Sequence, residues 1–342
     1  MKRLRILALM HPQLVPPDSR DDLTPQAASD SKTEFDVVHT LRRVGHEVRS
    51  LGVQYELLPI RDAIEEFKPH IVFNLLEEFH GEVLFDQNVV SFLELLHAPY
   101  TGCNPRGMII SRGKALSKKL VAYHRIRVPD FAVFALGHKV RRPPRLHFPL
   151  IVKSLIEHAS VGIARASVVD TDDRLAERVA FIHERVGTDA IAEQFIEGRE
   201  LYVSVLGNDR LTVFPVWELV ATNRPEGEPL IATAKVKHDV GYQQRHGIDT
   251  RAAELPDDLA AKLMHAARRI YKILELTGYA RLDFRLEAGG QFYFLEANPN
   301  PEIADREEFA LAAAAAGVPY DALLQRIVSL GLRQLRTNAG TE

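Results

Sequence analysis

Short apolar runs alternate with amphipathic segments over the first hundred residues. The pattern predicts strands at residues 5–10, 47–51 and 71–75, separated and followed by helices at residues 34–44, 60–67 and 85–96. Strands that alternate with helices in this way are typical of βαβ units, and therefore of a parallel sheet. No Gly-x-Gly-x-x-Gly motif follows the first strand, so nothing here indicates dinucleotide binding in the Rossmann manner.

A polar segment rich in Asp, Ser and Pro, residues 12–32, separates the first predicted strand from the first predicted helix. Two interpretations are open. The segment is a flexible surface loop, or it is a lid or substrate loop, because long loops in compact domains often carry function.

The pattern changes near residue 99, where Gly102, Pro105 and Gly107 mark a junction. Downstream we predict helices at 114–123, 174–185 and 259–276, and strands at 131–134, 150–153, 163–168, 192–195, 201–206 and 211–217. A polar stretch at 222–250 is followed by a hairpin with strands at 280–287 and 291–298. A last helix has Leu323, Leu324, Ile327 and Leu330 on its buried face. The predicted fold is α/β with α+β lobes, divided into residues 1–98, 99–190 and 191–336, before a disordered tail at 337–342.

Composition and charge narrow the class of protein. Lys plus Arg number 43 against 46 Asp plus Glu, a net charge of −3, so a nucleic-acid partner is disfavoured. Cys103 is the single cysteine, which excludes an intramolecular disulfide, and we interpret it as a packing residue. The apolar run 6–10 is too short for a signal peptide, and no stretch approaches the roughly 20 apolar residues of a membrane span. We expect a soluble, cytoplasmic protein without a membrane partner.

The predicted C-terminal hairpin concentrates polar side chains. Period-two alternation puts two sets of residues on one face each, Arg281, Asp283 and Arg285 on the first strand, and Phe292, Phe294, Glu296 and Asn298 on the second. Carboxylate and amide oxygens are hard ligands of the kind magnesium takes, so Asp283, Glu296 and Asn298 are candidate metal ligands. The alternative is a solvated polar face on which Arg281 pairs with Asp283.

Two further segments contain groups that a triphosphate site requires. A predicted apolar strand ends in Lys153, and a loop with Ser160 and Gly162 follows. Such a loop can offer backbone N–H groups and a hydroxyl to phosphate oxygens while the lysine supplies charge; the alternative is a simple hairpin turn. Residues 193–200 form an apolar edge flanked by carboxylates, with Gly198 allowing a turn. This edge can bind adenine and ribose, or it is an ordinary strand, turn and strand.

Taken in order, these segments resemble the ATP-grasp superfamily, and within it the D-alanine–D-alanine ligases, from about residue 70 to residue 333. The matching motifs, in chain order, are His80-Gly81, Pro99-Tyr100-Thr101-Gly102, Lys114, Lys153 with the loop to Gly162, residues 193–200, Lys235, Arg281-Leu282-Asp283-Phe284 and Glu296-Ala297-Asn298-Pro299. The resemblance implies an ATP-grasp fold preceded by an N-terminal parallel-sheet domain.

The resemblance also assigns roles to individual residues. The implied nucleotide contacts are Lys114 and Lys153 on the α- and β-phosphates, Lys235 on the γ-phosphate, Ser160 and Gly162 in the phosphate loop, and Glu193, Phe195, Ile196 and Glu200 on adenosine. The implied magnesium ligands are Asp283, Glu296 and Asn298, for two ions that manganese can replace. The implied catalytic residues are Arg281, Lys235 and Ser160, and His80 is assigned to the substrate.

The implied activity is ATP-dependent ligation of a carboxylate to an amine. The carboxylate attacks the γ-phosphate to form an acyl-phosphate, and the amine then displaces phosphate. Magnesium and lysines neutralise the transferring group, Arg281 stabilises the oxyanion, and the stretch 233–246 closes over the site. The implied partners are small amino-acid or peptide-like substrates and a second copy in a homodimer. The rivals are an ATP-grasp kinase and a non-catalytic nucleotide binder, although Arg281 and Lys235 argue against the latter.

The sequence departs from the D-alanine ligases after Asn298. Acidic residues stand where those ligases bind the carboxylate of the second substrate, in Pro299-Asn300-Pro301-Glu302 and then Asp305, Arg306, Glu307 and Glu308. We therefore predict an amine substrate that is cationic or lacks a free carboxylate, with Asp305 or Glu307 facing it. The alternative is that these acids favour the start of the next helix, where negative charge is stabilising.

Overall fold

The N-terminal part of the chain builds a small parallel sheet. The computed structural model describes residues 2–19, 24–156, 163–223, 236 and 239–338. Its first sheet has the order β2-β1-β3, all parallel, from strands β1 (Arg5–Met10), β2 (Glu47–Gly52) and β3 (Ile71–Asn74). The helices that accompany it are α2 (Lys32–Arg43), α3 (Leu58–Phe67) and α4 (Asp86–Leu95). The predicted parallel sheet is confirmed.

The polar segment at residues 12–32 is more regular than predicted. A short 3-10 helix η1 (Pro12–Leu14) and an α-helix α1 (Pro25–Asp30) lie within it, so the prediction of a loop is wrong for these parts. Each helix begins at a proline, whose fixed φ suits a first helical position. Residues 20–23 lie outside the described chain.

The predicted junction after residue 99 also contains a helix. Helix α5 (Pro105–Arg112) precedes α6 (Lys114–Tyr123). The Asn104 side chain caps α5 by accepting a hydrogen bond of 2.8 Å from the Gly107 amide, and Pro105 takes the first helical position. An N-cap followed by proline is a helix start, and the sequence interpretation took these residues only as a break.

A four-stranded sheet follows. It has the order β4-β7-β5-β6, and its elements are β4 (Phe131–Phe134), β5 (Leu150–Ser154), η3 (Arg165–Ser167), β6 (Val168–Val169), α7 (Asp172–Arg185) and β7 (Ala190–Gln194). The sequence interpretation assigned the strand near residue 192 to the next segment. In the structure β7 pairs antiparallel with both β4 and β5, so it is a central strand of this sheet.

The third sheet has six strands and carries the C-terminal hairpin. Its order is β11-β10-β8-β12-β13, with β9 paired to β8, and its strands are β8 (Arg199–Leu206), β9 (Thr212–Val213), β10 (Trp217–Ala221), β11 (Ile248–Ala252), β12 (Tyr279–Leu286) and β13 (Phe292–Asn298). The strand predicted at 211–217 is divided into β9 and β10, because the two pair with different parts of β8. Helix α9 (Val240–His246) lies within the predicted polar stretch.

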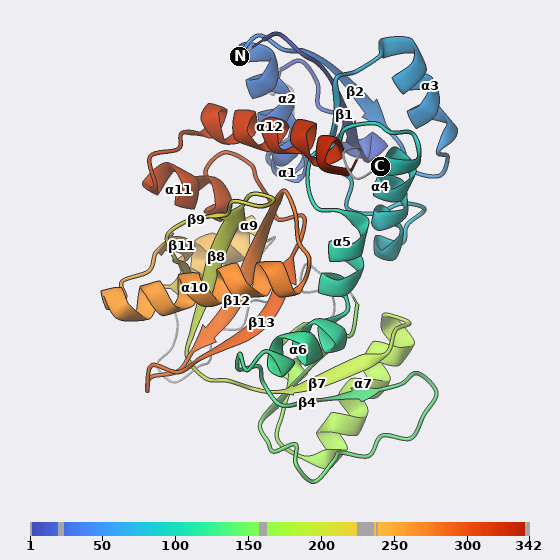
Figure 1. The fold of residues 1–342 in the computed structure, drawn as a ribbon. Helices are drawn as coiled ribbons and strands as arrows, with labels where there is room; N and C mark the ends of the chain where they lie inside the picture. The colour runs from blue at the N-terminus through green and yellow to red at the C-terminus, as the bar shows by residue number, and fades with distance from the viewer. Residues whose placement is uncertain (1, 20–23, 157–162, 224–235, 237–238, 339–342) are drawn as a thin grey trace.

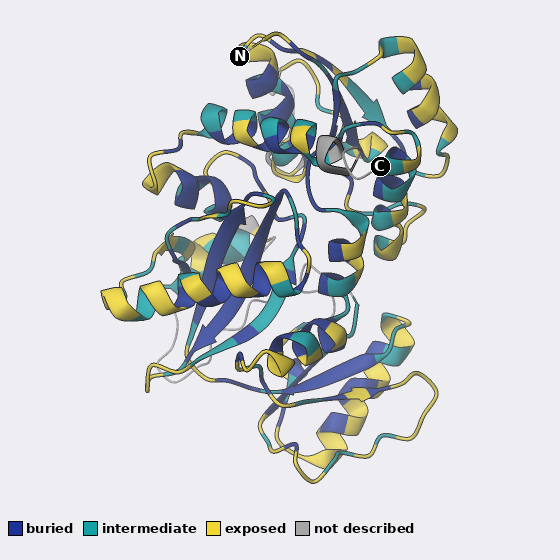
Figure 2. Ribbon diagram, viewed as in Figure 1, coloured by how far each residue is buried: buried dark blue, intermediate teal, exposed yellow. Residues whose placement is uncertain are grey.

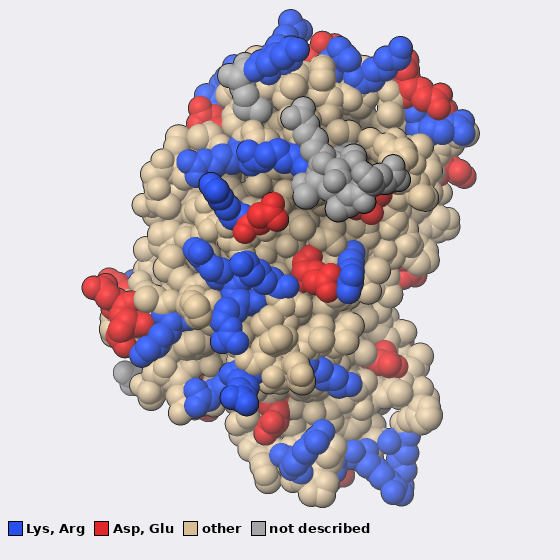
Figure 3. All heavy atoms as spheres, viewed as in Figure 1, with Lys and Arg blue, Asp and Glu red and all other residues tan. Residues whose placement is uncertain are grey.

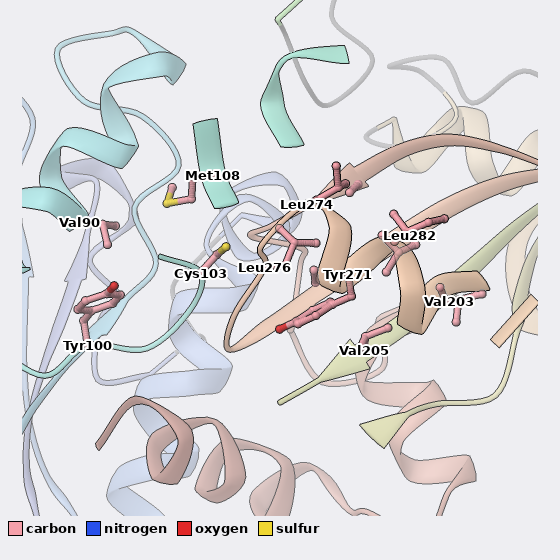
Figure 4. Packing of buried hydrophobic residues seen from close by; sticks show 14 of the residues in the cluster. Val90, Tyr100, Cys103, Met108, Val203, Val205, Tyr271, Leu274, Leu276 and Leu282 are labelled. Carbon is pink, nitrogen blue, oxygen red and sulfur yellow. The ribbon is translucent and has the colours of Figure 1, made fainter. Parts of the chain in front are cut away.

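Helix α10 (Asp257–Ile273) covers one face of the six-stranded sheet (Figure 1). Its inner side chains, including Tyr271, are buried against Val203, Val205 and Leu282, while its outer face is exposed (Figure 2). The same core extends to Cys103 and Tyr100 (Figure 4). Burial raises the pKa of the Cys103 thiol to about 12, which fits a packing residue.

The end of the chain returns to the N-terminal sheet. Helix α11 (Glu308–Ala315) is followed by α12 (Tyr320–Asn338), which lies beside α2 and β3 (Figure 1). Ile327 of α12 belongs to the same buried cluster as Phe73 of β3. Because α12 continues to Asn338, the tail predicted from residue 337 begins too early, and residues 339–342 lie outside the described chain.

The surface carries both signs of charge. On the face shown in Figure 3, acidic and basic side chains are interspersed over the described elements. Among the helices described here, none is both long enough and apolar enough to cross a membrane.

Candidate active site

A β-bulge in the C-terminal hairpin creates the polar face of the site. The register pairs Phe284 with Phe294 but Asp283 with Glu296, so Leu295 has no partner across the hairpin. Residues directly opposite each other on paired strands share a face. The bulge therefore turns Phe294 into the core, with ring centroids 6.0 Å from Phe284, and turns Glu296 to the opposite face beside Asp283.

This register corrects the predicted faces of the hairpin. Simple alternation had put Phe292 and Phe294 on the same face as Glu296 and Asn298. The extra residue Leu295 separates the two pairs, because a one-residue insertion reverses the direction of every later side chain. The predicted association of Asp283, Glu296 and Asn298 with one another is kept, since Arg281 also pairs with Asn298.

The polar face continues onto β8. Register places Glu200, Tyr202 and Ser204 beside Arg285, Asp283 and Arg281, respectively. Arg281 donates to both Asp283 oxygens, from Nε at 2.8 Å and Nη2 at 3.0 Å, and from Nη1 to Glu308 at 2.6 Å. Its guanidinium carbon also lies 4.7 Å from the centre of the Tyr202 ring. The arginine is thus oriented by two carboxylates and one aromatic face.

The buried carboxylate of Glu193 forms ion pairs with two lysines. Glu193 on β7 is fully buried, and its Oε1 lies 2.9 Å from Lys118 Nζ while its Oε2 lies 3.2 Å from Lys153 Nζ. Lys118 also donates to the carbonyl of Leu295, the bulged residue. Lys114 Nζ lies 3.5 Å from Glu296 Oε2. The lysines therefore connect α6 and β5 to the hairpin.

The charges in this lysine group shift one another's pKa values. Burial alone would raise the pKa of Glu193, but the charges of Lys118 and Lys153 outweigh burial and lower it. Burial lowers the pKa of Lys114 and of Lys118. For Lys153 burial acts the same way, but the charges of Glu193 and Glu296 prevail and raise its pKa. Glu193 is thus held ionised between two cations.

The residues predicted to contact adenosine lie on both sides of Gly198. Phe195 and Ile196 are buried, and the Phe195 amide donates to the Pro149 carbonyl at 2.9 Å. Glu200 accepts from Arg285 Nη2 at 3.0 Å and from the Tyr202 hydroxyl at 3.1 Å. Glu193, by contrast, points into the lysine group described above.

The donor set of the hairpin suits a metal that takes most of its ligands from phosphate and water. Asp283 and Glu296 are opposite each other on paired strands, and each is already approached by a cation, Arg281 and Lys114, respectively. Asn298 Oδ1 accepts from the Asn300 amide at 3.0 Å. The described residues contain no cluster of three or more His, Cys, Asp or Glu side chains placed to hold a metal alone. These oxygen donors fit magnesium brought with a nucleotide.

The residues predicted for the substrate make different contacts. His80 is exposed, with a left-handed φ of 62°, and the centre of its ring lies 5.0 Å from the centre of the Tyr55 ring. Asp305 is exposed, and its amide donates to Asp36 at 3.0 Å. Glu307 forms an ion pair with Lys32 of α2. Three other predicted site residues, Ser160, Gly162 and Lys235, lie outside the described chain.

The sequence analysis did not assign a role in the site to Lys118 or to Glu308. Lys118 follows Lys114 by four residues, so the two share one face of α6, and this spacing was a readable signal. Glu308 reaches Arg281 only because the chain folds back after β13, and no local pattern indicated that contact.

The arrangement defines a class of protein. A six-stranded sheet carries paired carboxylates on a hairpin, a smaller sheet carries Lys153 and Glu193, and the chain begins with a parallel sheet. This is the architecture of an ATP-grasp ligase. The comparisons with known proteins agree. The family model described as D-ala D-ala ligase C-terminus matches residues 120–329, and the chain belongs to the D-alanine–D-alanine ligase family of ATP-dependent carbon–nitrogen ligases.

Relatives and solved structures cover most of the chain. An uncharacterized protein, y4sG of Sinorhizobium fredii, is 30% identical over 318 residues, which is 91% of this chain and 90% of that protein. The D-alanine–D-alanine ligase of Bordetella petrii is 35% identical over 257 residues, 73% of each chain. The D-alanine–D-alanine ligase of Bacillus anthracis complexed with ATP has a TM-score of 0.75 at 23% identity, covering 98% of this chain and 99% of that one. Family members act on small amino-acid substrates.

Proposed function

We propose that this enzyme joins a carboxylate to an amine through an acyl-phosphate formed from ATP. The single observation that carries the proposal is the juxtaposition of Lys114 with Glu296 and of Lys118 and Lys153 with Glu193. Cations and oxygen donors from three elements meet at one hairpin, which is the requirement for binding a metal–triphosphate and transferring its terminal phosphoryl group.

In this proposal each predicted residue has a defined part in nucleotide binding. The phosphates are bound by Lys114, Lys153, Lys235 and the loop with Ser160 and Gly162, adenosine by Phe195, Ile196 and Glu200, and magnesium by Asp283, Glu296 and Asn298. Glu193, which the sequence predicted to contact adenosine, instead holds Lys118 and Lys153. When bound, magnesium neutralises charge on the phosphate oxygens. The lysines around Glu193 add fixed positive charge in a buried setting, where it acts more strongly than in water.

The reaction proceeds in two balanced steps. A carboxylate oxygen of the first substrate attacks the γ-phosphorus; an O–P bond forms, the bond to the β–γ bridging oxygen breaks, and ADP leaves. The free amine of the second substrate attacks the acyl carbon; a C–N bond forms, the C–O bond to phosphate breaks, and the amine loses a proton. Arg281 stabilises the oxyanion between these events, since Asp283 and Glu308 orient its guanidinium.

The relatives named as D-alanine–D-alanine ligases suggest amino acids as substrates. We propose a different second substrate, because acidic residues follow Asn298 in this chain. Assembly as a homodimer, in line with the resemblance, is part of the proposal and is testable by sedimentation.

Product analysis tests the proposed reaction. The protein is incubated with ATP, magnesium and pools of amino acids and dipeptides, and products are measured as ADP, phosphate and new masses. The expected result is substrate-dependent ADP release with free phosphate and an amide product. A stable phosphorylated substrate without an amide product would show that the protein is a kinase and not a ligase. Efficient synthesis of D-alanyl-D-alanine would overturn the proposal of a different second substrate.

A further inference from the structure

A pocket with basic side chains lies where α10 meets the segment after α6 and the first residue of β13. Its volume is about 700 Å³, within the range of sites that bind small molecules. The basic residues that line it are Arg125, Arg127, Lys262, His265 and Arg269, and no acidic residue is found in this lining among the residues that the structure describes. We refer to this site as the basic pocket.

Helix α10 supplies one wall of the basic pocket. Lys262, His265 and Arg269 follow one another at intervals of three and four residues, and side chains at these intervals share one face of a helix. All three residues are exposed, and basic side chains gather over α10 on the face shown in Figure 3. The positive charge of this wall is therefore accessible to a ligand from solution.

The end of α6 shapes the opposite wall. The Arg125 amide donates to the Ala122 carbonyl at 2.8 Å, and the Ile126 amide donates to the Val121 carbonyl at 3.3 Å. These two hydrogen bonds form a Schellman motif, in which Arg125 takes the left-handed position with a φ of 61°. The turn buries Ile126 and leaves Arg125 and Arg127 exposed on either side of it.

Hydrogen bonds to the main chain fix the two walls relative to each other. Arg269 Nη2 donates to the His124 carbonyl at 3.0 Å, which joins α10 to the end of α6. The Phe294 amide donates to the Arg127 carbonyl at 2.9 Å, which joins the segment after α6 to β13. A guanidinium group has five N–H donors, so Arg269 can hold the wall and still bind a ligand. The basic pocket is thus preformed.

The protein offers little negative charge to the basic pocket. Lys262 Nζ lies 2.9 Å from Asp258 Oδ2, but both side chains are largely exposed, and such a pair is weak. Arg125, Arg127 and Arg269 form no ion pair within the described part of the chain. Like charges around one cavity repel each other, and a bound anion offsets that repulsion.

The rest of the lining gives the basic pocket an apolar part. Ile126, Ala266 and Phe292 contribute to it, and the first two are buried. An apolar group bound against them leaves water, which favours binding. The basic pocket therefore suits a ligand that combines negative charge with an apolar body, and its volume exceeds that of a single inorganic ion.

The basic pocket is separate from the proposed ATP site. The centre of the Phe292 ring lies 5.9 Å from that of Phe284, so Phe292 is on the face of the hairpin that carries the core under α10. Asp283 and Glu296 are on the opposite face because of the bulge at Leu295. A ligand can occupy the basic pocket without displacing a nucleotide.

We propose that the basic pocket binds a small organic anion with at least two negative charges, carried by phosphate or carboxylate groups on an apolar body. Guanidinium groups recognise phosphate and carboxylate alike, because their planar N–H donors match pairs of oxygen atoms. The anion is neither the nucleotide nor a reacting substrate of the proposed ligation.

Isothermal titration of the full-length protein with four probes tests the ligand class. Naphthyl phosphate and benzenetricarboxylate are organic anions, naphthol has an apolar body without the charge, and inorganic phosphate has the charge without the body. At least one organic anion should bind at least about tenfold more tightly than naphthol and inorganic phosphate. The tighter of the two anions identifies the recognised group as phosphate or carboxylate. If neither exceeds naphthol and inorganic phosphate, the inference is wrong.

Variants test where the anion binds. Arg127→Gln and Arg269→Gln each remove one guanidinium of the lining, and Arg268→Gln removes an exposed neighbour on α10 that does not line the pocket. Affinity for the tighter organic anion should fall at least about fivefold in each pocket variant. It should stay within about twofold of the wild type in Arg268→Gln. Equal losses in Arg268→Gln and Arg269→Gln would show a general effect of charge and overturn the inference.

Competition separates the basic pocket from the proposed ATP site. The titration is repeated with magnesium and an excess of a non-hydrolysable ATP analogue. Affinity for the organic anion should stay within about twofold, because the two sites lie on opposite faces of the hairpin. Loss of anion binding in the presence of the analogue would place the anion in the ATP site and contradict the inference.

Discussion

Glu193 is fully buried between Lys118 and Lys153, so the loss of either lysine should lower the free energy of unfolding. A buried ion pair contributes little net stability, but removing one partner leaves an uncompensated charge. Lys118 is the partner whose loss is easiest to assess, because the next residue, Lys119, is an exposed lysine on the same helix.

Lys118→Met should lower the free energy of unfolding by about 3–5 kcal/mol, the usual cost of breaking a buried pair from one side. Lys119→Met should change it by less than about 0.5 kcal/mol. Denaturant unfolding followed by circular dichroism measures both. Equal stabilities of the two variants would show that Lys153 alone neutralises Glu193.

Glu34 predicts a pH dependence of stability. Its pKa in the folded protein is raised from 4.5 to about 7, so the folded state holds the proton more tightly than the unfolded state. The contribution of Glu34 to stability is then full below pH 4.5 and is lost as pH rises through 7. Relative to Glu34→Gln, the wild type should lose on the order of 3 kcal/mol between about pH 5 and pH 8. Thermal unfolding across pH checks this, and parallel profiles for the two proteins would refute it.

Several single residues could be assigned from the sequence because their chemistry is local to a motif. Asp283 and Glu296 were recognisable as oxygen donors, and the structure places them opposite each other. Glu34 and Glu308 were not recognisable, because their surroundings come from segments far away in the chain. A lone glutamate near a helix start has an ordinary explanation until its burial is known.

At the scale of elements, the bulge at Leu295 decides which side chains reach the site. Most strands and helices followed from apolar periodicity, since burial of one face leaves a regular pattern. A bulge adds one residue to a strand and leaves no mark in the apolar and polar pattern. Strict alternation then assigns the wrong face to the residues on one side of the bulge. Asn104 and Pro105 are a recognisable start for helix α5, but the nearby Gly102 and Gly107 favoured the interpretation of a junction.

The turn between β7 and β8 offers a test at this scale. Gly198 has a φ of 140°, and a Cβ there would lie 2.0 Å from the carbonyl oxygen of Leu286. Gly198→Ala should therefore destabilise the protein by about 1–3 kcal/mol. Gly289→Ala in the hairpin turn, where a Cβ meets no atom within 4 Å, is the control and should be near neutral. A similar loss of thermal stability in both variants would count against this steric explanation.

At the scale of the whole molecule, the last helix shares one buried core with the N-terminal sheet and with part of the six-stranded sheet. Helix α12 packs on α2 and β3, so the C-terminal residues complete the core of the N-terminal sheet. The sequence predicted the apolar face of this helix but not its partner, because periodicity identifies a buried face without saying what covers it. The same return of the chain brings α2 and the segment after β13 into contact through Lys32 and Glu307.

If the hairpin binds magnesium–ATP, calorimetric titration of ATP with and without magnesium should detect it. Glu296→Gln removes one proposed ligand, and Glu287→Gln, in the turn region of the same hairpin, is the control. We predict magnesium-dependent binding in the wild type and in Glu287→Gln, with affinity at least roughly tenfold weaker in Glu296→Gln, equivalent to about 1.4 kcal/mol. Unchanged affinity and unchanged magnesium dependence in Glu296→Gln would contradict this role of the hairpin.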